Sequence, residues 1–316
     1  MKKLSNKILV IGFVVLIGAF AASRFFRSPG LESNLRTELL KLDTADISEI
    51  RILPSRERTE ELKLKREGNS WKVVKGDRTE QGSQATIKGV LGSLVNMQAQ
   101  RLVSRKKEKW EEYNVGEKST HVTAFEDGNK IADFHVGKLG FVQNSGGQFG
   151  GAYTYVRLSD EDEVYVVEGF LESSFNVSFN DWRDKTFLKL DRNEITKISF
   201  RYPADSGFVV DKRDSVWYMA DQKIDPFKME GVLDQFSTKF FTEFVDGFTP
   251  GSPAQISIQV DGKSGPLITI EAWKKDDTEW VCTSSLQKGI YFSSKGSTIV
   301  SDHFVNRKKL FPEIKK

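Results

Sequence analysis

Two short patterns each occur twice in the chain, and this repetition constrains the fold more than any other feature of the sequence. The segment Leu188–Asp191 reads Leu-Lys-Leu-Asp and is followed by isoleucines seven and ten positions after its first leucine; Leu40–Asp43 has the same sequence and the same two isoleucines. A second pattern, Arg-x-Lys-x-Phe, begins at Arg183 and again at Arg307. The spacing is far longer than that of stacked solenoid repeats, so it predicts two folded units in tandem.

The two predicted units show the same order of structural signals. Strand-like alternation at Leu62–Lys65 and a turn at Gly68 precede a strand with Trp71, and Trp217 stands at the corresponding place later in the chain. Each tryptophan precedes apolar residues spaced three and four apart, which predicts one helix per unit. The members of these two helical faces are Ile87, Val90, Leu91, Leu94 and Val95, and then Val232, Leu233, Phe236 and Phe240. We therefore expect an α+β fold of two similar domains, each an antiparallel sheet with one main helix.

The N-terminus predicts a membrane segment. Residues 8–23 are uncharged and mostly apolar, between Lys7 and Arg24. A bilayer span needs ~20 residues, and Arg24 can reach the interface while its stem extends the apolar run. We favour an uncleaved anchor helix over its two alternatives, a cleaved signal peptide and an apolar arm in the cytosol.

These signals divide the chain into a membrane anchor (1–27), a linker (28–38), a first unit (39–186) and a second unit (187–316). The basic residues before the apolar run favour a cytoplasmic N-terminus. The expected location is the inner (cytoplasmic) membrane, crossed once, with the body extracytoplasmic or periplasmic.

The net charge of +3 comes from the predicted anchor. Five of the 47 basic residues lie before residue 28, where no acid occurs. The rest of the chain therefore has 42 basic and 44 acidic residues. A nearly neutral body argues against nucleic acid as a partner.

Residues that carry chemistry are few. His121 and His135 flank the turn at Asp127 and Gly128, and a regular two-residue hairpin would place the two rings on opposite faces. A shared metal is then not expected, although a bulge in the hairpin would reopen that question. His303 stands apart from them. Cys282 is the only cysteine and is expected to be a buried small side chain. We assign no catalytic, cofactor-binding or metal-ligating residue and expect a protein that is not an enzyme and needs no cofactor.

Four further segments have a structural and a functional interpretation, and we favour the structural one for each. Gly137–Gly151 matches no phosphate-binding spacing and is expected to be a long hairpin loop, although such loops can bind partners. The acidic turn Asp160–Glu163 is expected to be solvated, with calcium as the alternative. The basic run Arg101–Lys109 is interrupted by acids and is expected to be a solvated loop. Arg183 and its repeat Arg307 are expected to form surface or interdomain ion pairs.

With these landmarks in place, the chain resembles the bacterial domain-of-unknown-function family 4340 over about residues 39–312. The second unit departs most at Gly265-Pro266 and Trp273–Trp280. The resemblance implies a membrane-anchored, exported protein, often encoded beside ABC-type transporter or gliding-type auxiliary subunits, and it supplies no catalytic residues. The residues that carry it are Trp71, Leu91, Leu94, Gly137, Tyr155, Val156, Val164, Tyr165, Arg183, Lys185, Leu188 and Trp217.

We accordingly expect a membrane-tethered, extracytoplasmic, non-catalytic accessory or binding protein. Its expected partners are the membrane, through the N-terminal helix, and proteins of an ABC-type transport or gliding-type envelope complex. Two alternatives stay open: an envelope hydrolase acting on glycan or lipid, and a structural spacer.

Overall fold

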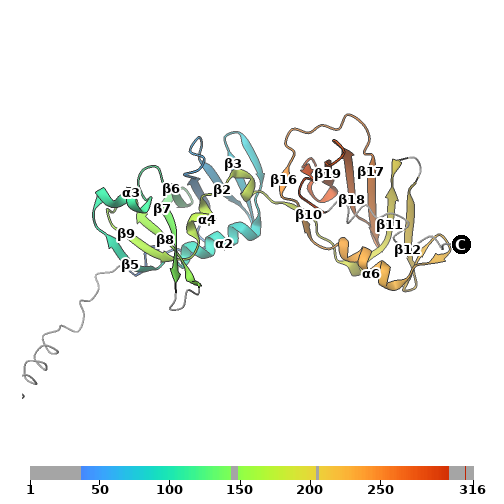
Figure 1. The fold of residues 1–316 in the computed structure, drawn as a ribbon, viewed down its shortest axis with the longest axis horizontal. Coiled ribbons are helices and arrows are strands. Elements are labelled where there is room, and N and C mark those ends of the chain that lie inside the picture. Colours follow the sequence, from blue (N-terminus) through green and yellow to red (C-terminus); the bar gives the residue numbers. More distant parts are fainter. Residues whose placement is uncertain (1–36, 144–148, 204–205, 299–309, 311–316) are drawn as a thin grey trace, which may run out of the picture. The chain divides into compact units, whose positions relative to one another are not determined.

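The computed structural model describes residues 37–143, 149–203 and 206–298, together with Leu310. The chain forms two compact units, divided in the sequence between Trp182 and Arg183 (Figure 1). The expected anchor helix falls within residues 1–36, outside the described residues. Within the described ranges, no helix has both the length and the apolar character needed to cross a bilayer. The expected single-pass location in the inner membrane, with a periplasmic body, is thereby corrected: the described helices give it no support.

The first unit is built on one antiparallel sheet of nine strands, in the order β4-β3-β2-β1-β6-β7-β8-β9-β5. In its described part, four short helices and one longer helix, α2, connect or cover the strands. The elements are β1 (Glu49–Leu53), β2 (Leu62–Glu67), β3 (Ser70–Lys75), β4 (Arg78–Gln81), α2 (Gln84–Val95), β5 (Ala99–Ser104), η1 (Lys107–Lys109), α3 (Trp110–Tyr113), β6 (Thr120–Glu126), β7 (Asn129–Gln143), β8 (Phe149–Leu158), β9 (Val164–Glu168), α4 (Leu171–Phe175) and α5 (Phe179–Trp182).

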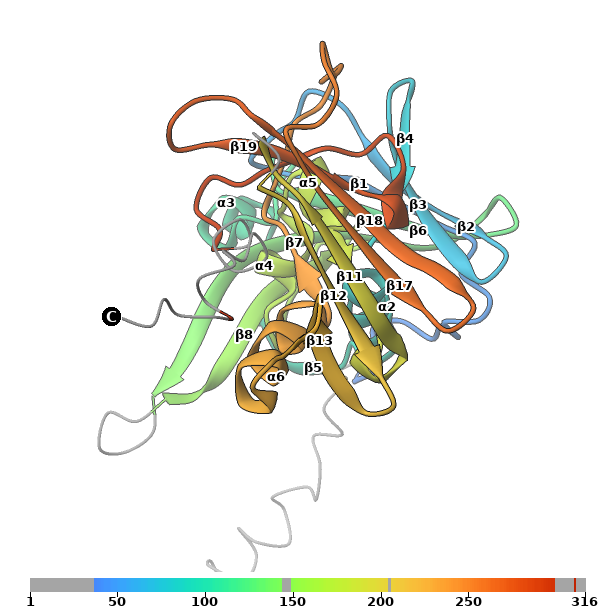
Figure 2. The same ribbon diagram turned by 90° about the vertical axis from the view of Figure 1, so that its right-hand side faces the viewer.

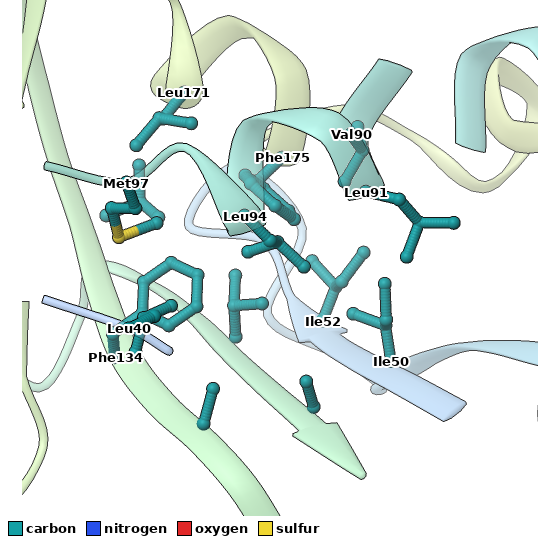
Figure 3. Packing of buried hydrophobic residues seen from close by; sticks show 14 of the residues in the cluster. Leu40, Ile50, Ile52, Val90, Leu91, Leu94, Met97, Phe134, Leu171 and Phe175 are labelled. Atoms are coloured by element: carbon teal, nitrogen blue, oxygen red, sulfur yellow. The ribbon is translucent and has the colours of Figure 1, made fainter. Parts of the chain in front are cut away.

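Helix α2 lies in sequence between β4 and β5, the two edge strands of this sheet. It therefore connects one edge of the sheet to the other. Ser83 caps the helix by accepting a hydrogen bond from the Thr86 amide. Its buried side chains, including Val90, Leu91 and Leu94, meet Ile50 and Ile52 of β1 (Figure 3). Burial of each such side chain contributes roughly 1.5–3 kcal/mol. The main core of the unit therefore lies between α2 and the sheet.

A glycine on the outside of α2 offers a test of this helix. Gly89 is exposed, and a Cβ added there would meet no other atom within 4 Å. Because glycine is the less favourable residue in a helix interior, we expect Gly89→Ala to raise the free energy of unfolding by about 0.5–1 kcal/mol. Urea denaturation of the variant and the wild type measures this difference; a lower midpoint for the variant would contradict the description of α2.

The second unit repeats the strand order of the first, as β14-β13-β12-β11-β17-β18-β19-β20-β16. Helix α6 again lies between the two edge strands in sequence, and it packs against β13 (Figure 2). Strands β10 and β15 form a separate two-stranded sheet. The elements are β10 (Thr186–Leu188), η2 (Arg192–Glu194), β11 (Ile195–Arg201), β12 (Phe208–Arg213), β13 (Val216–Met219), β14 (Gln222–Lys223), α6 (Pro226–Gln235), β15 (Lys239–Phe240), β16 (Glu243–Phe244), β17 (Ile256–Gly262), β18 (Gly265–Lys274), β19 (Trp280–Ser284), η4 (Ser285–Gln287) and β20 (Phe292–Ser293).

The expected α+β class, with an N-terminal helix, is wrong, because the described chain is mostly antiparallel sheet. Only α2 and α6 exceed five residues among the described helices. The prediction from the sequence missed several strands, because they are too short or too polar to show an alternation of apolar and polar residues. Strand β4 reads Arg-Thr-Glu-Gln and β14 has two residues, yet each completes an edge of its sheet.

One extra residue interrupts the β6–β7 hairpin. Ala124 pairs with Ala132, but the next residue, Phe125, pairs with Lys130, so Ile131 has no partner. Such a bulge changes the register of every pair beyond it, and a change of one residue moves side chains to the other face.

The β17–β18 hairpin has its bulge at the same distance from its turn, with Leu267 as the extra residue. Counting pairs from each turn makes Asp127 equivalent to Lys263, rather than to Asp261 as the Asp-Gly dipeptides suggest. The same count places Trp71 and Trp217 in the second pair from the β2–β3 and β12–β13 turns, opposite Arg66 and Lys212.

Candidate functional site

The bulge at Ile131 brings the two described histidines together. His121 pairs directly with His135, and their rings stack with centroids 4.7 Å apart and planes 15° apart. The prediction that the two rings face apart assumed a regular hairpin and is wrong. Phe134 and Val136 belong to the main core, so His135 and its neighbour Asp133 lie on the opposite face of the sheet.

We call this opposite face of strands β6 to β9 the outer face of the first unit. Part of it is covered by α3 and the segment that follows, through a small second core of Trp110, Val115 and Val164. Beside this core is a cavity of about 450 Å³, which we call the histidine cavity. Its lining is mostly polar and consists of Arg58, Lys107, Trp110, Glu117, His121, Asp133, His135, Arg157, Ser159, Asp160, Glu161 and Asp162.

Asp133 is the best-satisfied charge in the cavity. Its carboxylate accepts hydrogen bonds from Lys130 Nζ (2.6 Å), His121 Nε2 (2.6 Å) and Ser159 Oγ (2.5 Å). Burial alone would raise the pKa of Asp133, but these three donors outweigh it and lower the pKa to about 2. Asp133 is therefore a fixed anion, and His121 presents its Nε2 hydrogen to it.

His135 is held as a neutral ring with a defined tautomer. Burial, reinforced by the nearby charge of Arg157, lowers the pKa of His135 to about 3. Its Nδ1 lies 2.8 Å from Ser119 Oγ, whose only hydrogen is donated to the Gly116 carbonyl at 2.6 Å. The hydrogen between them must therefore come from Nδ1 of His135, which leaves Nε2 with a lone pair and no partner among the described residues.

Arg157 lies in the same cavity with only 2% of its surface exposed. Nε donates to the Val115 carbonyl at 3.0 Å, and the guanidinium lies 3.8 Å from the centre of the Trp110 ring. Nη1 donates to three further carbonyls at 3.2–3.4 Å, those of Leu158, Ser159 and Glu161. Burial lowers the pKa of Arg157. None of these contacts is an ion pair, so a buried positive charge is held by dipoles and an aromatic ring.

The glycine-rich segment Gly137–Gly151 is mostly strand, which corrects the expected loop: β7 runs to Gln143 and β8 starts at Phe149. Residues 144–148 lie outside the described part. Gly140 leaves room for the ring of Tyr153, which packs at 5.5 Å against Tyr155. Tyr155 in turn packs at 4.8 Å against Tyr113, with Lys138 Nζ within 5.7 Å of both of these rings. Gly140 thus serves packing on the outer face.

The other residues singled out in the sequence have separate places. The acidic turn at Asp160 lines the histidine cavity. Arg183 is buried within the second unit, where it pairs with Asp246 at 3.0 Å and stacks on Phe244. Cys282 is buried, and burial raises the pKa of its thiol to about 12. His303 and Arg307 lie outside the described residues.

Sequence reasoning missed Arg157, Trp110 and the pairing of the histidines. A signal for that pairing was present, because adjacent apolar residues Ile131 and Ala132 break the alternation of β7, as a bulge does. Across the described ranges, no group of three or more His, Cys, Asp or Glu side chains is arranged to hold a metal ion.

A family model described as a domain of unknown function, DUF4340, matches residues 71–257, which is well over half of the chain. The chain therefore belongs to this family, as its resemblance indicated. The match runs from Trp71 in β3 to Ser257 in β17 and includes most of the residues that line the histidine cavity. No curated protein and no solved structure gives a significant match.

Proposed function

We propose that this chain is a non-catalytic binding protein and that the outer face of its first unit is the binding surface. One observation carries the proposal: the same hairpin occurs twice, but only one copy has the ionisable cluster. Counted by strand pairing, the residues equivalent to His121, Asp133, His135 and Arg157 are Ser257, Thr269, Glu271 and Thr283. Since the second unit forms the same strands without this cluster, the fold does not require it, and a role in binding accounts for it.

The contacts around Ser119 support binding over hydrolysis. A serine nucleophile needs a base that accepts its hydrogen. Ser119 instead donates to the Gly116 carbonyl and accepts from His135. A histidine whose pKa is about 3 is also a weak base near neutral pH.

The family resemblance supplies the kind of assembly. We include in the proposal that the chain is an accessory subunit of an ABC-type transport or gliding-type complex. Outer-face residues suit a protein partner, since tyrosine is among the residues that contribute most binding energy in such interfaces. Tyr113 and Tyr155 are of this kind, and the exposed Lys138 lies near both rings.

The test is quantitative crosslinking in cells that carry the full chain, with partners identified by mass spectrometry. We expect Lys138→Glu to reduce the main crosslinked partner by roughly tenfold, because a reversed charge beside two tyrosines is placed in the interface. Lys88→Glu, the same change on the exposed side of α2, is the matched control. Equal loss in both variants, or no loss in either, would argue for a spacer that presents no specific surface.

A parallel arm addresses the hydrolase. Ser119→Ala and Asp133→Asn are introduced separately, and circular dichroism checks their folding. If either variant abolished the cellular phenotype while the crosslinked partner was retained, the protein would be a hydrolase and the proposed binding function would be rejected.

A further inference from the structure

We propose that the histidine cavity binds a carboxylate group, with Arg157 and Arg58 as its cationic contacts. This inference rests on the binding function proposed above and names the chemistry that the site recognises.

The first step is that no carboxylate contacts the buried charge of Arg157. Its guanidinium is almost fully buried and has only carbonyl oxygens and the Trp110 ring as partners. No carboxylate among the described residues forms an ion pair with it. A buried ion without a counter-charge is costly, and the cost falls when an anion with good hydrogen-bond geometry joins it. The equivalent position in the second unit is Thr283, so the hairpin does not need an arginine there.

The second step is that no acid lining the cavity pairs directly with this charge. Asp133 is already paired with Lys130 and accepts a hydrogen bond from His121, and Glu161 accepts one from the Tyr165 hydroxyl. Glu117, Asp160 and Asp162 are exposed, so water and salt screen them over about 10 Å. The charges of Glu117, Asp162 and Asp133 act on Arg157 only from a distance, and none of them contacts its guanidinium.

The third step selects the kind of anion. Arg58 is exposed at the cavity, donates Nη1 to the Ser119 carbonyl at 2.5 Å and has no ion pair among the described residues. Screening weakens the repulsion from the three exposed acids, Glu117, Asp160 and Asp162, but what remains is about twice as strong for a dianion as for a monoanion at equal distance. A carboxylate therefore fits this cavity better than a phosphate.

The fourth step is the partnerless Nε2 of His135. The charged or titratable groups near this ring are Arg157 on β8, His121 on β6, Asp133 on β7 and Arg58 after β1. A carboxylate placed among them adds a negative charge, which favours protonation of His135, and protonated Nε2 can donate to the ligand. Binding is then accompanied by proton uptake and strengthens as the pH falls below neutrality.

The test uses the full chain with acetate and inorganic phosphate as probes, followed by the ring signals of His135 in NMR spectra. We expect saturable shifts with acetate, weaker ones with phosphate, and a rise of the His135 pKa in the acetate complex. Arg157→Gln should weaken acetate binding roughly ten- to hundredfold, as expected for a lost charge-assisted contact. Arg58→Gln should weaken it roughly threefold.

Arg56→Gln is the matched control, because Arg56 is exposed two residues away and does not line the cavity. If Arg157→Gln fails to fold, the effect of Arg58→Gln and the pKa of His135 in the acetate complex still test whether the cavity binds a carboxylate. Three results overturn the proposal: no saturable shift with acetate, tighter binding of phosphate, or equal effects of the Arg58 and Arg56 substitutions.

A second arm separates two sources of the carboxylate. If the group belongs to a protein, a short peptide with a free C-terminal carboxylate should bind better than acetate, and its C-terminal amide should not bind. If it belongs to a small acid, peptide and acetate should bind alike. One outcome separates this inference from the proposed function. If Arg58→Gln still crosslinked to the partner that depends on Lys138, and acetate did not bind, the binding function would be retained. The carboxylate ligand would then be rejected.

Discussion

Lowering the pH from 7 to 5 should cost the protein about 2 kcal/mol of folding free energy through His135 alone. The pKa of this ring is about 3 in the folded chain, against an ordinary 6.5. Below pH 6.5 this histidine binds a proton in the unfolded chain but not in the folded chain. The free energy of unfolding therefore falls by about 1.4 kcal/mol per pH unit until the pH reaches the pKa of the folded chain. Asp133 acts in the same direction but in a lower window, from 3.8 down to about 2.

Urea unfolding at pH 7 and pH 5 measures this loss, and His135→Asn should remove most of it. Asparagine keeps an N–H that can reach Ser119 but has no charge to gain. His121→Asn is the matched control, because it retains the His135 ring. Parallel losses in the wild type and His135→Asn between pH 7 and pH 5 would show that the buried ring is not the cause.

Gly137→Ala should destabilise the first unit by roughly 2–3 kcal/mol, the cost of overpacking a closed site. A Cβ at this position would lie 2.3 Å from the Tyr113 carbonyl oxygen and 2.6 Å from Val115 Cγ1. Backbone forms the nearer obstacle, so the α3 segment would have to move away from the sheet. Because Ser119 and the Val115 carbonyl follow α3, the contacts of His135 and Arg157 should weaken as well.

Gly140→Ala is the control for this second prediction. It makes the same change three residues further along β7, where the obstacle is the ring of Tyr153. A side chain can rotate away, so the loss should be clearly smaller. Thermal unfolding ranks the two variants, and a larger loss for Gly140→Ala would contradict the packing described around Gly137.

The sequence was sufficient for the parts of the fold that depend on strong local patterns. The apolar spacing that ends at Val95 predicted α2, and the Trp71 hairpin is also present. The overall class was missed because edge strands such as β4 and β14 gain their pairing from neighbours and have no periodicity of their own. The strand character of Gly137–Gln143 was missed because glycine usually marks loops, whereas here it allows close approach.

The candidate site was harder to predict than the fold. A pairing register depends on every residue between two positions, so one bulge was enough to reverse the expected faces of His121 and His135. Arg157 gave no signal at all, because an arginine in a strand is ordinarily on the surface. Its burial depends on Trp110, 47 positions earlier in the sequence, which only the folded chain brings to it.

The bulge at Ile131 also bears on how the hairpin can vary in length. Hairpin turns usually accept insertions and deletions, and a sequence alignment commonly places its gaps there. Here, loss of one residue between Glu126 and Ala132 would remove the bulge and leave the pairs beyond it unchanged. Phe134 would stay in the core, and His135 would still lie opposite His121. When related sequences are aligned, a gap of one residue in this stretch should therefore not be counted as a change of the site.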